Sequence, residues 1–208
     1  FCCSGSVYHR CEFIYETASD SPAPGGGSIA ALSAASAAAL IEMVANLTIG
    51  KKGYEEVEEE IKELKGVAAE YKEKFINYID EDSDSFNKIM DAFKMPKNTE
   101  EEKKARTKVI QEGFKGAATV PLNVAKDAFE LLALAEKVIE KGNQNAVTDG
   151  AVAAMSARTA VHSALYNVKI NLGSIKDEEF VNTTKKKIEE LESNVNKIEE
   201  EILNKVEL

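Results

Sequence analysis

The stretch from Ile29 to Ile49 limits most strongly what this chain can fold into, because it is a long apolar run with few charges. Its length is compatible with a membrane span. However, it is built from alanine and serine rather than leucine and phenylalanine, and it contains Glu42 and Asn46, which are costly inside a bilayer. Small side chains allow helix backbones to approach closely, so the stretch predicts the central helix of a soluble bundle that does not enter a membrane.

Apolar residues recur in steps of three and four along the following chain, and no stretch has the strict alternation of a half-buried strand. The longest stripe begins near Tyr54 and stops before Pro96, which predicts one long helix. Thr99 and Glu102 have the spacing of a capping box that opens the next helix. Pro121 lies within that helix and is expected to kink or break it.

Two further helices complete the predicted fold. One runs from near Asn145 to Leu172, and Asp177 is placed to cap the other. The last helix has a heptad of apolar residues at Val181, Ile188, Leu191, Val195, Ile198 and Ile202. The sequence therefore predicts an all-α fold, a single-domain bundle of about five long antiparallel helices over residues 18–208, after an N-terminal segment, residues 1–17, of unclear role.

Composition excludes several kinds of partner. The chain has 208 residues, enough for one domain, with a net charge of −10, so no nucleic acid is expected as a ligand. The cysteines are Cys2, Cys3 and Cys11, which cannot cross-link the body of the fold, and a reducing cytoplasmic location is expected. With His9 they match no usual zinc pattern, and this end resembles neither a signal nor a transit peptide. A disordered end is expected.

A glycine-rich turn, residues 21–28, directly precedes the alanine-rich helix. Its glycines, Gly25, Gly26 and Gly27, reach conformations closed to other residues, and a helix N-terminus offers free N–H groups to an anion. The turn lacks the Gly-Lys-Ser/Thr ending of a P-loop, and no strand precedes it. It is equally compatible with a tight turn into a crowded core, with Ser28 as the N-cap.

Asp82 lies on the apolar stripe of the long helix, four residues after Tyr78 and four before Phe86. A carboxylate there should face the interior, where burial raises its pKa toward the range useful for proton transfer. Asp80 and Asp84 lie on other faces. The alternative is that the stripe ends here and the run is a solvated acidic patch.

Polar residues also interrupt the apolar helices. They are Asn46, Asn143, Asn145, Asp149, His162, Asn167 and Asn171. Asn167 and Asn171 share a helix face and could present amides to a heterocycle. Hydrogen bonds between packed helices explain any single one of these residues more simply, and a lone histidine is more often structural than catalytic.

The order of these motifs resembles the C-terminal family of formiminotransferase-cyclodeaminases over roughly residues 18 to 200. The motifs are Ser21-Pro-Ala-Pro-Gly-Gly-Gly-Ser28, Met43 to Lys52, Asp80-Glu-Asp82, Pro96-Lys-Asn98, Val120-Pro121-Leu122, Gly142-Asn143 and Tyr166 to Leu172. The glycine-rich turn followed by the alanine-rich helix and Gly-Lys-Lys is specific to that family.

The resemblance implies a homodimer that binds a tetrahydrofolate derivative as substrate and uses no metal or other cofactor. It places the acid/base aspartate at Asp80 or Asp82, and the stripe selects Asp82. The substrate-binding residues it suggests are Gly25, Gly26, Gly27, Ser28, Asn46, Lys51, Lys52, Asn143, Asn145, Asp149, Asn167 and Asn171. Of these, Lys51 and Lys52 would bind the glutamate tail, unless they only complement a helix C-terminus.

The leading expected reaction closes 5-formimino-tetrahydrofolate to 5,10-methenyl-tetrahydrofolate with loss of ammonia. Methenyltetrahydrofolate cyclohydrolase activity is the first alternative, since the family includes both kinds of enzyme. A helical scaffold without catalytic activity is the second.

Overall fold

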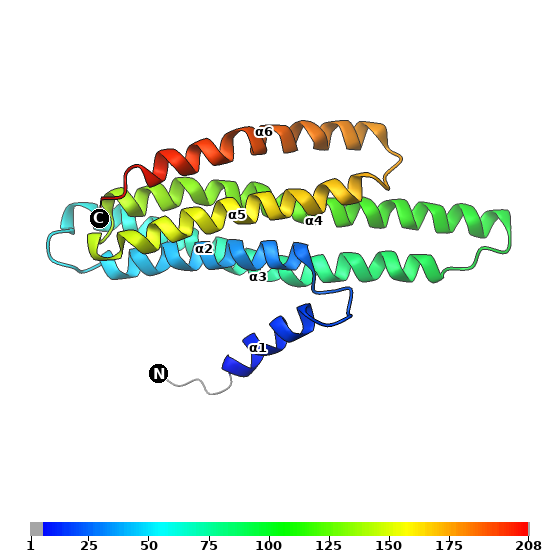
Figure 1. Ribbon diagram of the computed structural model, residues 1–208, viewed down its shortest axis with the longest axis horizontal. Helices are drawn as coiled ribbons and strands as arrows, with labels where there is room; N and C mark the ends of the chain where they lie inside the picture. The colour runs from blue at the N-terminus through cyan, green and yellow to red at the C-terminus, as the bar shows by residue number, and fades with distance from the viewer. Residues whose placement is uncertain (1–5, 208) are drawn as a thin grey trace.

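The computed structural model describes the backbone of residues 6–207 and the side chains of residues 12–207. Over that range the chain is helical, with no strand (Figure 1). The helices are α1 Ser6–Thr17, α2 Gly26–Thr48, α3 Glu58–Lys94, α4 Glu100–Lys141, α5 Val147–Leu172 and α6 Glu178–Leu203, with short 3-10 helices η1 Glu55–Val57 and η2 Gln144–Ala146. The predicted all-α class is confirmed, and α2 to α6 are the expected long helices.

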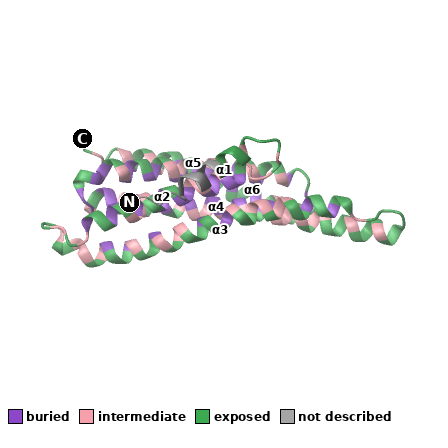
Figure 2. Cartoon of the chain, turned by 90° about the horizontal axis from the view of Figure 1, so that it is seen from below, coloured by how far each residue is buried: buried purple, intermediate pink, exposed green. Residues whose placement is uncertain are grey.

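Helix α2 lies at the centre of the bundle. It packs against α3 and α5 along much of its length and against α4 to a smaller extent, and α6 covers α4 and α5 from outside. Its inward alanines, such as Ala34 and Ala38, are fully buried and allow the neighbouring backbones to approach. Among the described helices, α2 alone is long and apolar enough to cross a membrane, and 56% of its most apolar window is buried inside the bundle. Figure 2 shows this buried band along the middle of the molecule.

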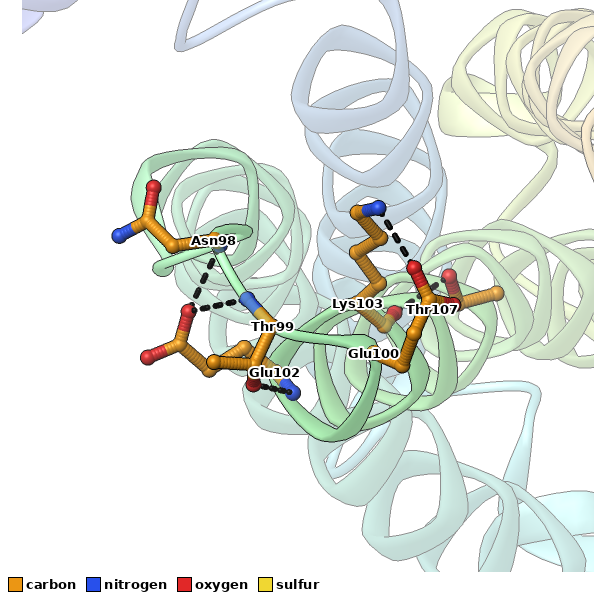
Figure 3. Close-up of polar contacts among 6 residues, drawn as sticks. All are labelled: Asn98, Thr99, Glu100, Glu102, Lys103 and Thr107. Carbon is orange, nitrogen blue, oxygen red and sulfur yellow. Dashed lines mark hydrogen bonds and ion pairs between the residues drawn. The ribbon is translucent and has the colours of Figure 1, made fainter.

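Helices α3 and α4 extend beyond the other helices at one end of the molecule as an antiparallel pair (Figure 1). The turn between them ends in a capping box (Figure 3). The Thr99 hydroxyl accepts a hydrogen bond from the Glu102 backbone N–H at 3.1 Å, and the Glu102 carboxylate accepts from the N–H groups of Asn98 and Thr99 at 2.7 and 3.2 Å. The predicted start of α4 is confirmed, because the N–H groups of Asn98, Thr99 and Glu102 at this end of the helix gain partners.

The sequence predicts a kink or a break at Pro121, and the break is wrong. Helix α4 runs without interruption from Glu100 to Lys141, with Pro121 buried inside it. Proline has no N–H, so the carbonyl four residues earlier, at Ala117, loses its usual helical donor. The side-chain amide of Asn171 on α5 donates to that carbonyl at 2.9 Å. A neighbouring helix therefore supplies the hydrogen bond that the proline removes.

Helix α6 begins as predicted, because the Asp177 carboxylate accepts a hydrogen bond from the Phe180 N–H at 3.0 Å. Its heptad residues Ile188, Val195 and Ile202 are buried.

The start of the chain differs from the expected disordered end. From Ser6 it forms α1, which diverges from the bundle (Figure 1). Cys2 and Cys3, and the side chains of His9 and Cys11, lie outside the described residues.

Replacement of Asn171 with alanine should lower the free energy of unfolding by about 1 to 3 kcal/mol, because the buried Ala117 carbonyl would lose its partner. In a Pro121→Ala background the same replacement should cost clearly less, since residue 121 would regain an N–H for that carbonyl. Urea unfolding of the two single variants and the double variant measures this coupling. Equal losses in both backgrounds would contradict the proposed role of Asn171.

Candidate functional site

The N-terminus of α2 meets the middle of α3, and the glycine-rich turn makes this contact possible. Gly25 is the N-cap of α2, so the predicted N-cap at Ser28 is wrong and Ser28 lies in the first helical turn. A Cβ atom on Gly27 would lie 2.1 Å from Oδ1 of Asp82. Only glycine lets the α2 backbone approach the carboxylate this closely.

Ser28 holds the Asp82 carboxylate from the α2 side. Its side chain is 0% exposed, and its hydroxyl lies 3.0 Å from Oδ2 of Asp82. The Ser28 hydroxyl oxygen also lies 3.2 Å from the carbonyl oxygen of Ile79 and 3.4 Å from the hydroxyl oxygen of Ser83. Because the hydroxyl has one proton and several acceptors around it, protonation of Asp82 can change which partner it serves.

Burial raises the pKa of Asp82 above the usual aspartate value, and hydrogen bonds from the Ser28 hydroxyl and backbone N–H oppose part of that rise. The carboxyl also lies at the positive end of the α2 dipole, which tempers the cost of its charge. Asp80 and Asp84 on the same helix are exposed. The structure therefore favours the interpretation that Asp82 faces the interior. A partly buried carboxyl whose pKa is raised is a candidate for accepting and returning a proton.

Helix α5 closes a third side of this region. A Cβ atom on Gly26 would lie 3.2 Å from the side-chain amide of Asn167, whose Nδ2 donates to the carbonyl of Ser163 at 2.9 Å. Asn171 lies one turn further along and contacts α4. The structure thus brings Gly26, Gly27, Ser28, Asp82 and Asn167 to one place.

The other predicted binding residues lie at the opposite end of α2. Lys51 donates to the side-chain oxygen of Asn143 at 2.6 Å, and that oxygen also accepts from the backbone N–H of Asn145 at 3.1 Å. The Asn143 amide donates in turn to the carbonyl of Leu47. Helix α2 separates this end from Ser28 by roughly 30 Å, because each helical residue adds about 1.5 Å along the axis.

Asn46, Lys52 and Asp149 belong to this distant end as well, and Asn46 and Lys52 are exposed. Within one chain, the predicted binding residues therefore form two separate groups.

A polar cluster next to Asp82 was missed by the sequence analysis. The Tyr78 hydroxyl donates to the Asp127 carboxylate at 3.0 Å, and Lys74 pairs with the same carboxylate at 2.7 Å. Burial, together with Asp127, raises the pKa of Tyr78 to about 12. In the sequence Tyr78 appears only as a member of the apolar stripe, and nothing marks Asp127 as its partner. The cluster ties α3 to α4 one turn before Asp82.

His162 pairs through Nε2 with the side-chain oxygen of Asn196 on α6 at 2.9 Å, a contact between packed helices. Over the residues whose side chains are described, no three histidine, cysteine or acidic residues are grouped to hold a metal ion.

The arrangement has counterparts among known proteins. The family model for formiminotransferase-cyclodeaminase matches residues 10–190. The chain belongs to this family.

Individual members of the cyclodeaminase family differ in their activities. A methenyltetrahydrofolate cyclohydrolase from Methylorubrum extorquens is 41% identical over 93% of each chain. The formimidoyltransferase-cyclodeaminase of Rattus norvegicus is 35% identical, and the match covers 86% of this chain but only 33% of that longer protein. A solved formiminotetrahydrofolate cyclodeaminase from Thermotoga maritima has a TM-score of 0.83 and 33% identity, over 94% of this chain and 93% of that one. The fold and a role in folate processing are thus shown at the level of the family.

Substitution of Asp82 with asparagine should raise the thermal midpoint at pH 7. Because the pKa of Asp82 is raised in the folded state, the folded protein favours the protonated acid. The stability that the protonated Asp82 contributes is complete below the ordinary aspartate pKa and is lost as pH rises through the pKa of the folded state. The gain from Asp82→Asn should therefore be present at pH 7 and vanish at low pH.

Calorimetry of Asp82→Asn across pH measures this effect, with Asp80→Asn as the matched control. Asp80 is exposed, so its replacement should change stability by no more than about 0.5 kcal/mol. A loss of stability in Asp82→Asn at pH 7 would show that the ionised carboxylate stabilises the fold.

Proposed function

We propose that this protein performs proton transfer on the one-carbon unit bound to N5 and N10 of tetrahydrofolate, with Asp82 as the acid/base group. The observation that carries the proposal is the Asp82 carboxyl, which is partly buried and of raised pKa at the N-terminus of α2. Membership of the cyclodeaminase family supplies the substrate class. Neither reaction in this family changes the oxidation state of the carbon, so we propose that no redox cofactor takes part.

The first candidate reaction is hydrolysis of 5,10-methenyl-tetrahydrofolate. Water adds to the methenyl carbon and gives up one proton to Asp82, which releases it to solvent. The bond from that carbon to N5 then breaks as the formyl carbonyl forms on N10, and the second water proton moves to N5. A single carboxyl of raised pKa suffices for both proton movements. The similarity to a cyclohydrolase, at 41% identity over 93% of each chain, favours this reaction.

The second candidate is the cyclodeaminase reaction expected from the sequence. N10 attacks the formimino carbon on N5, Asp82 takes the N10 proton, and a proton returns to the leaving amine as ammonia departs. The similarity to the solved formiminotetrahydrofolate cyclodeaminase from Thermotoga maritima supports this reaction. In both reactions the remaining acceleration would come from positioning of the reacting atoms.

The residues around Asp82 are proposed to orient the pterin. The first N–H groups of α2, from Gly26 onward, lack helical acceptors and point out of the helix N-terminus. Asn167 offers an amide on the α5 side. We further propose that the protein is a cytoplasmic homodimer, as expected for the family.

The test supplies each substrate separately to wild type and to Asp82→Asn, and follows methenyl absorbance together with ammonia. Loss of methenyl absorbance without ammonia identifies the hydrolase. A gain of methenyl absorbance with equimolar ammonia identifies the cyclodeaminase. Asp82→Asn should lower kcat by about 10² to 10⁴-fold in either case. Full activity in Asp82→Asn would remove Asp82 from the mechanism, and no turnover of either substrate by wild type would contradict the proposed function.

Replacement of Gly27 with alanine should lower kcat by about 10²-fold, because the new methyl group would displace the carboxylate by an ångström or more. The displaced group is the end of a side chain, so stability should change little. Steady-state kinetics and thermal unfolding of the variant measure the two effects.

Gly66→Ala is the matched control, because nothing lies within 4 Å of its Cβ position on α3. It should keep full activity and gain stability from its better helix propensity. Unchanged kcat in Gly27→Ala would show that the position of the Asp82 carboxylate is not critical.

A further inference from the structure

A groove between α4 and α6 contains hydrogen-bond donors and none of the residues gathered around Asp82. Helix α6 lies along α4 on the outside of the bundle (Figure 1). The groove has a volume of about 390 Å³, and its polar lining includes Lys126, Lys187, Thr184 and Asn123. All four side chains can donate hydrogen bonds. We call this the α4/α6 groove.

Thr184 brings a buried hydroxyl without a partner to this groove. Threonine hydroxyls in helices often donate to the carbonyl four residues earlier, as those of Thr107 and Thr119 do on α4. Thr184 is only 3% exposed, and among the described residues its hydroxyl forms no hydrogen bond. A buried hydroxyl that lacks a partner costs free energy. The hydroxyl is therefore available to a ligand in the groove.

Two positive charges meet in the same groove. Lys126 on α4 and Lys187 on α6 both line it, and neither forms an ion pair within the part of the chain that the structure describes. Burial lowers the pKa of Lys126, and Lys187 lowers it further through its charge and a side-chain hydrogen bond, whereas Asp127 opposes the fall. An ammonium group has no acceptor, so the two amines can share a hydrogen bond only while one is neutral. An anion between them would let both be charged.

The acidic residues near the lysine pair do not neutralise it. Asp177 lines the groove but is paired with Lys115 at 2.8 Å. Glu179 also lines the groove and is exposed to water. Glu130 and Glu190 are exposed and line an adjoining groove instead. The α4/α6 groove therefore keeps an excess of positive charge.

Part of the groove is apolar. Its lining includes Leu122, which is buried, and Phe180, which is half-buried. The volume falls within the range of small-molecule sites, about 300 to 1,000 Å³. The groove thus combines donors for an anionic group with a surface for an organic group.

We propose that the α4/α6 groove binds a small organic molecule through its phosphate group. The donors to the phosphate oxygens are Lys126, Lys187 and Thr184. The organic part lies against Leu122 and Phe180. A phosphate monoester carries a charge of about −1.5 to −2 at pH 7 and three strong acceptor oxygens, which suits two ammonium groups and a hydroxyl better than a singly charged carboxylate does.

Isothermal titration calorimetry with phenyl phosphate tests the lysine pair. Wild type should bind this probe, and Lys126→Met/Lys187→Met should bind it at least about tenfold more weakly, because two charge-assisted hydrogen bonds are lost. Lys185→Met/Lys186→Met is the matched control, since it removes the same charge from exposed positions on α6 that do not line the groove. No binding by wild type, or equal losses in the two double variants, would overturn the proposal.

The same titration of Asp82→Asn separates the groove from the site at the start of α2. This variant should bind phenyl phosphate as tightly as wild type, because Asp82 does not line the groove. Binding that is lost in Asp82→Asn would place the anion at the other site and overturn the proposal. The measurement needs no turnover, so its result is independent of the reaction proposed for Asp82.

Thr184→Val tests the buried hydroxyl with little change of side-chain shape. It should weaken the binding of phenyl phosphate about tenfold, and Thr184→Ser should restore most of the affinity. The thermal midpoint of the ligand-free protein should stay the same or rise in Thr184→Val, since the hydroxyl has no partner to lose. Unchanged affinity together with a lower thermal midpoint would show that the hydroxyl is structural and overturn its role in binding.

Three probes test the class of ligand. Phenyl phosphate should bind more tightly than inorganic phosphate, because its ring gains contact with the apolar part of the groove. Benzoate, which has the ring but a single negative charge, should bind more weakly than phenyl phosphate. Benzoate that binds as tightly as phenyl phosphate would overturn the assignment of a phosphate group, and inorganic phosphate that binds as tightly would overturn the organic part.

Discussion

The close approach of the α3 carboxylate to the start of α2 is the contact on which the site depends. Gly27 has no side chain where Asp82 needs space, and Ser28 places a buried hydroxyl on the carboxylate. The same contact partly removes Asp82 from water and sets it at the positive end of a helix. Burial raises its pKa, whereas the helix end and the hydrogen bonds from Ser28 favour the ionised form and oppose part of that rise.

The alanine-rich core explains how the contact is held. Fully buried alanines along α2 let α3 and α5 lie close to its backbone, so a glycine at its first turn reaches a side chain on α3. Close packing of α4 and α5 also accommodates the buried proline, because Asn171 on α5 donates to the Ala117 carbonyl that Pro121 leaves without a helical donor. Tyr78, Asp127 and Lys74 then fix α3 against α4 next to the site. Polar groups in this bundle mainly tie helices together, and Asp82 differs in lying beside an open helix N-terminus.

Much of the fold could be predicted from the sequence, because helical periodicity and caps are local signals. The capping box at Thr99 and the cap at Asp177 were predicted correctly for this reason. The break at Pro121 was predicted wrongly, since the compensating amide lies on another helix. Asp82 could be placed from the apolar stripe alone, but its contact with Gly27 and Ser28 depends on how α2 and α3 pack. The length of the predicted helix between Ser28 and Lys51 is enough to show that the two residues lie far apart in one chain. The resemblance to the family nevertheless suggested that both bind the substrate.

The pH dependence of kcat/KM tests the central claim most directly, because it reports the proton-transferring group of the free enzyme. If Asp82 acts as the base, activity should fall on the acid side with a pKa above the ordinary aspartate value, and this acid limb should be absent from the residual activity of Asp82→Asn. An acid limb that survives unchanged in Asp82→Asn would contradict the account, because another group would then carry the proton.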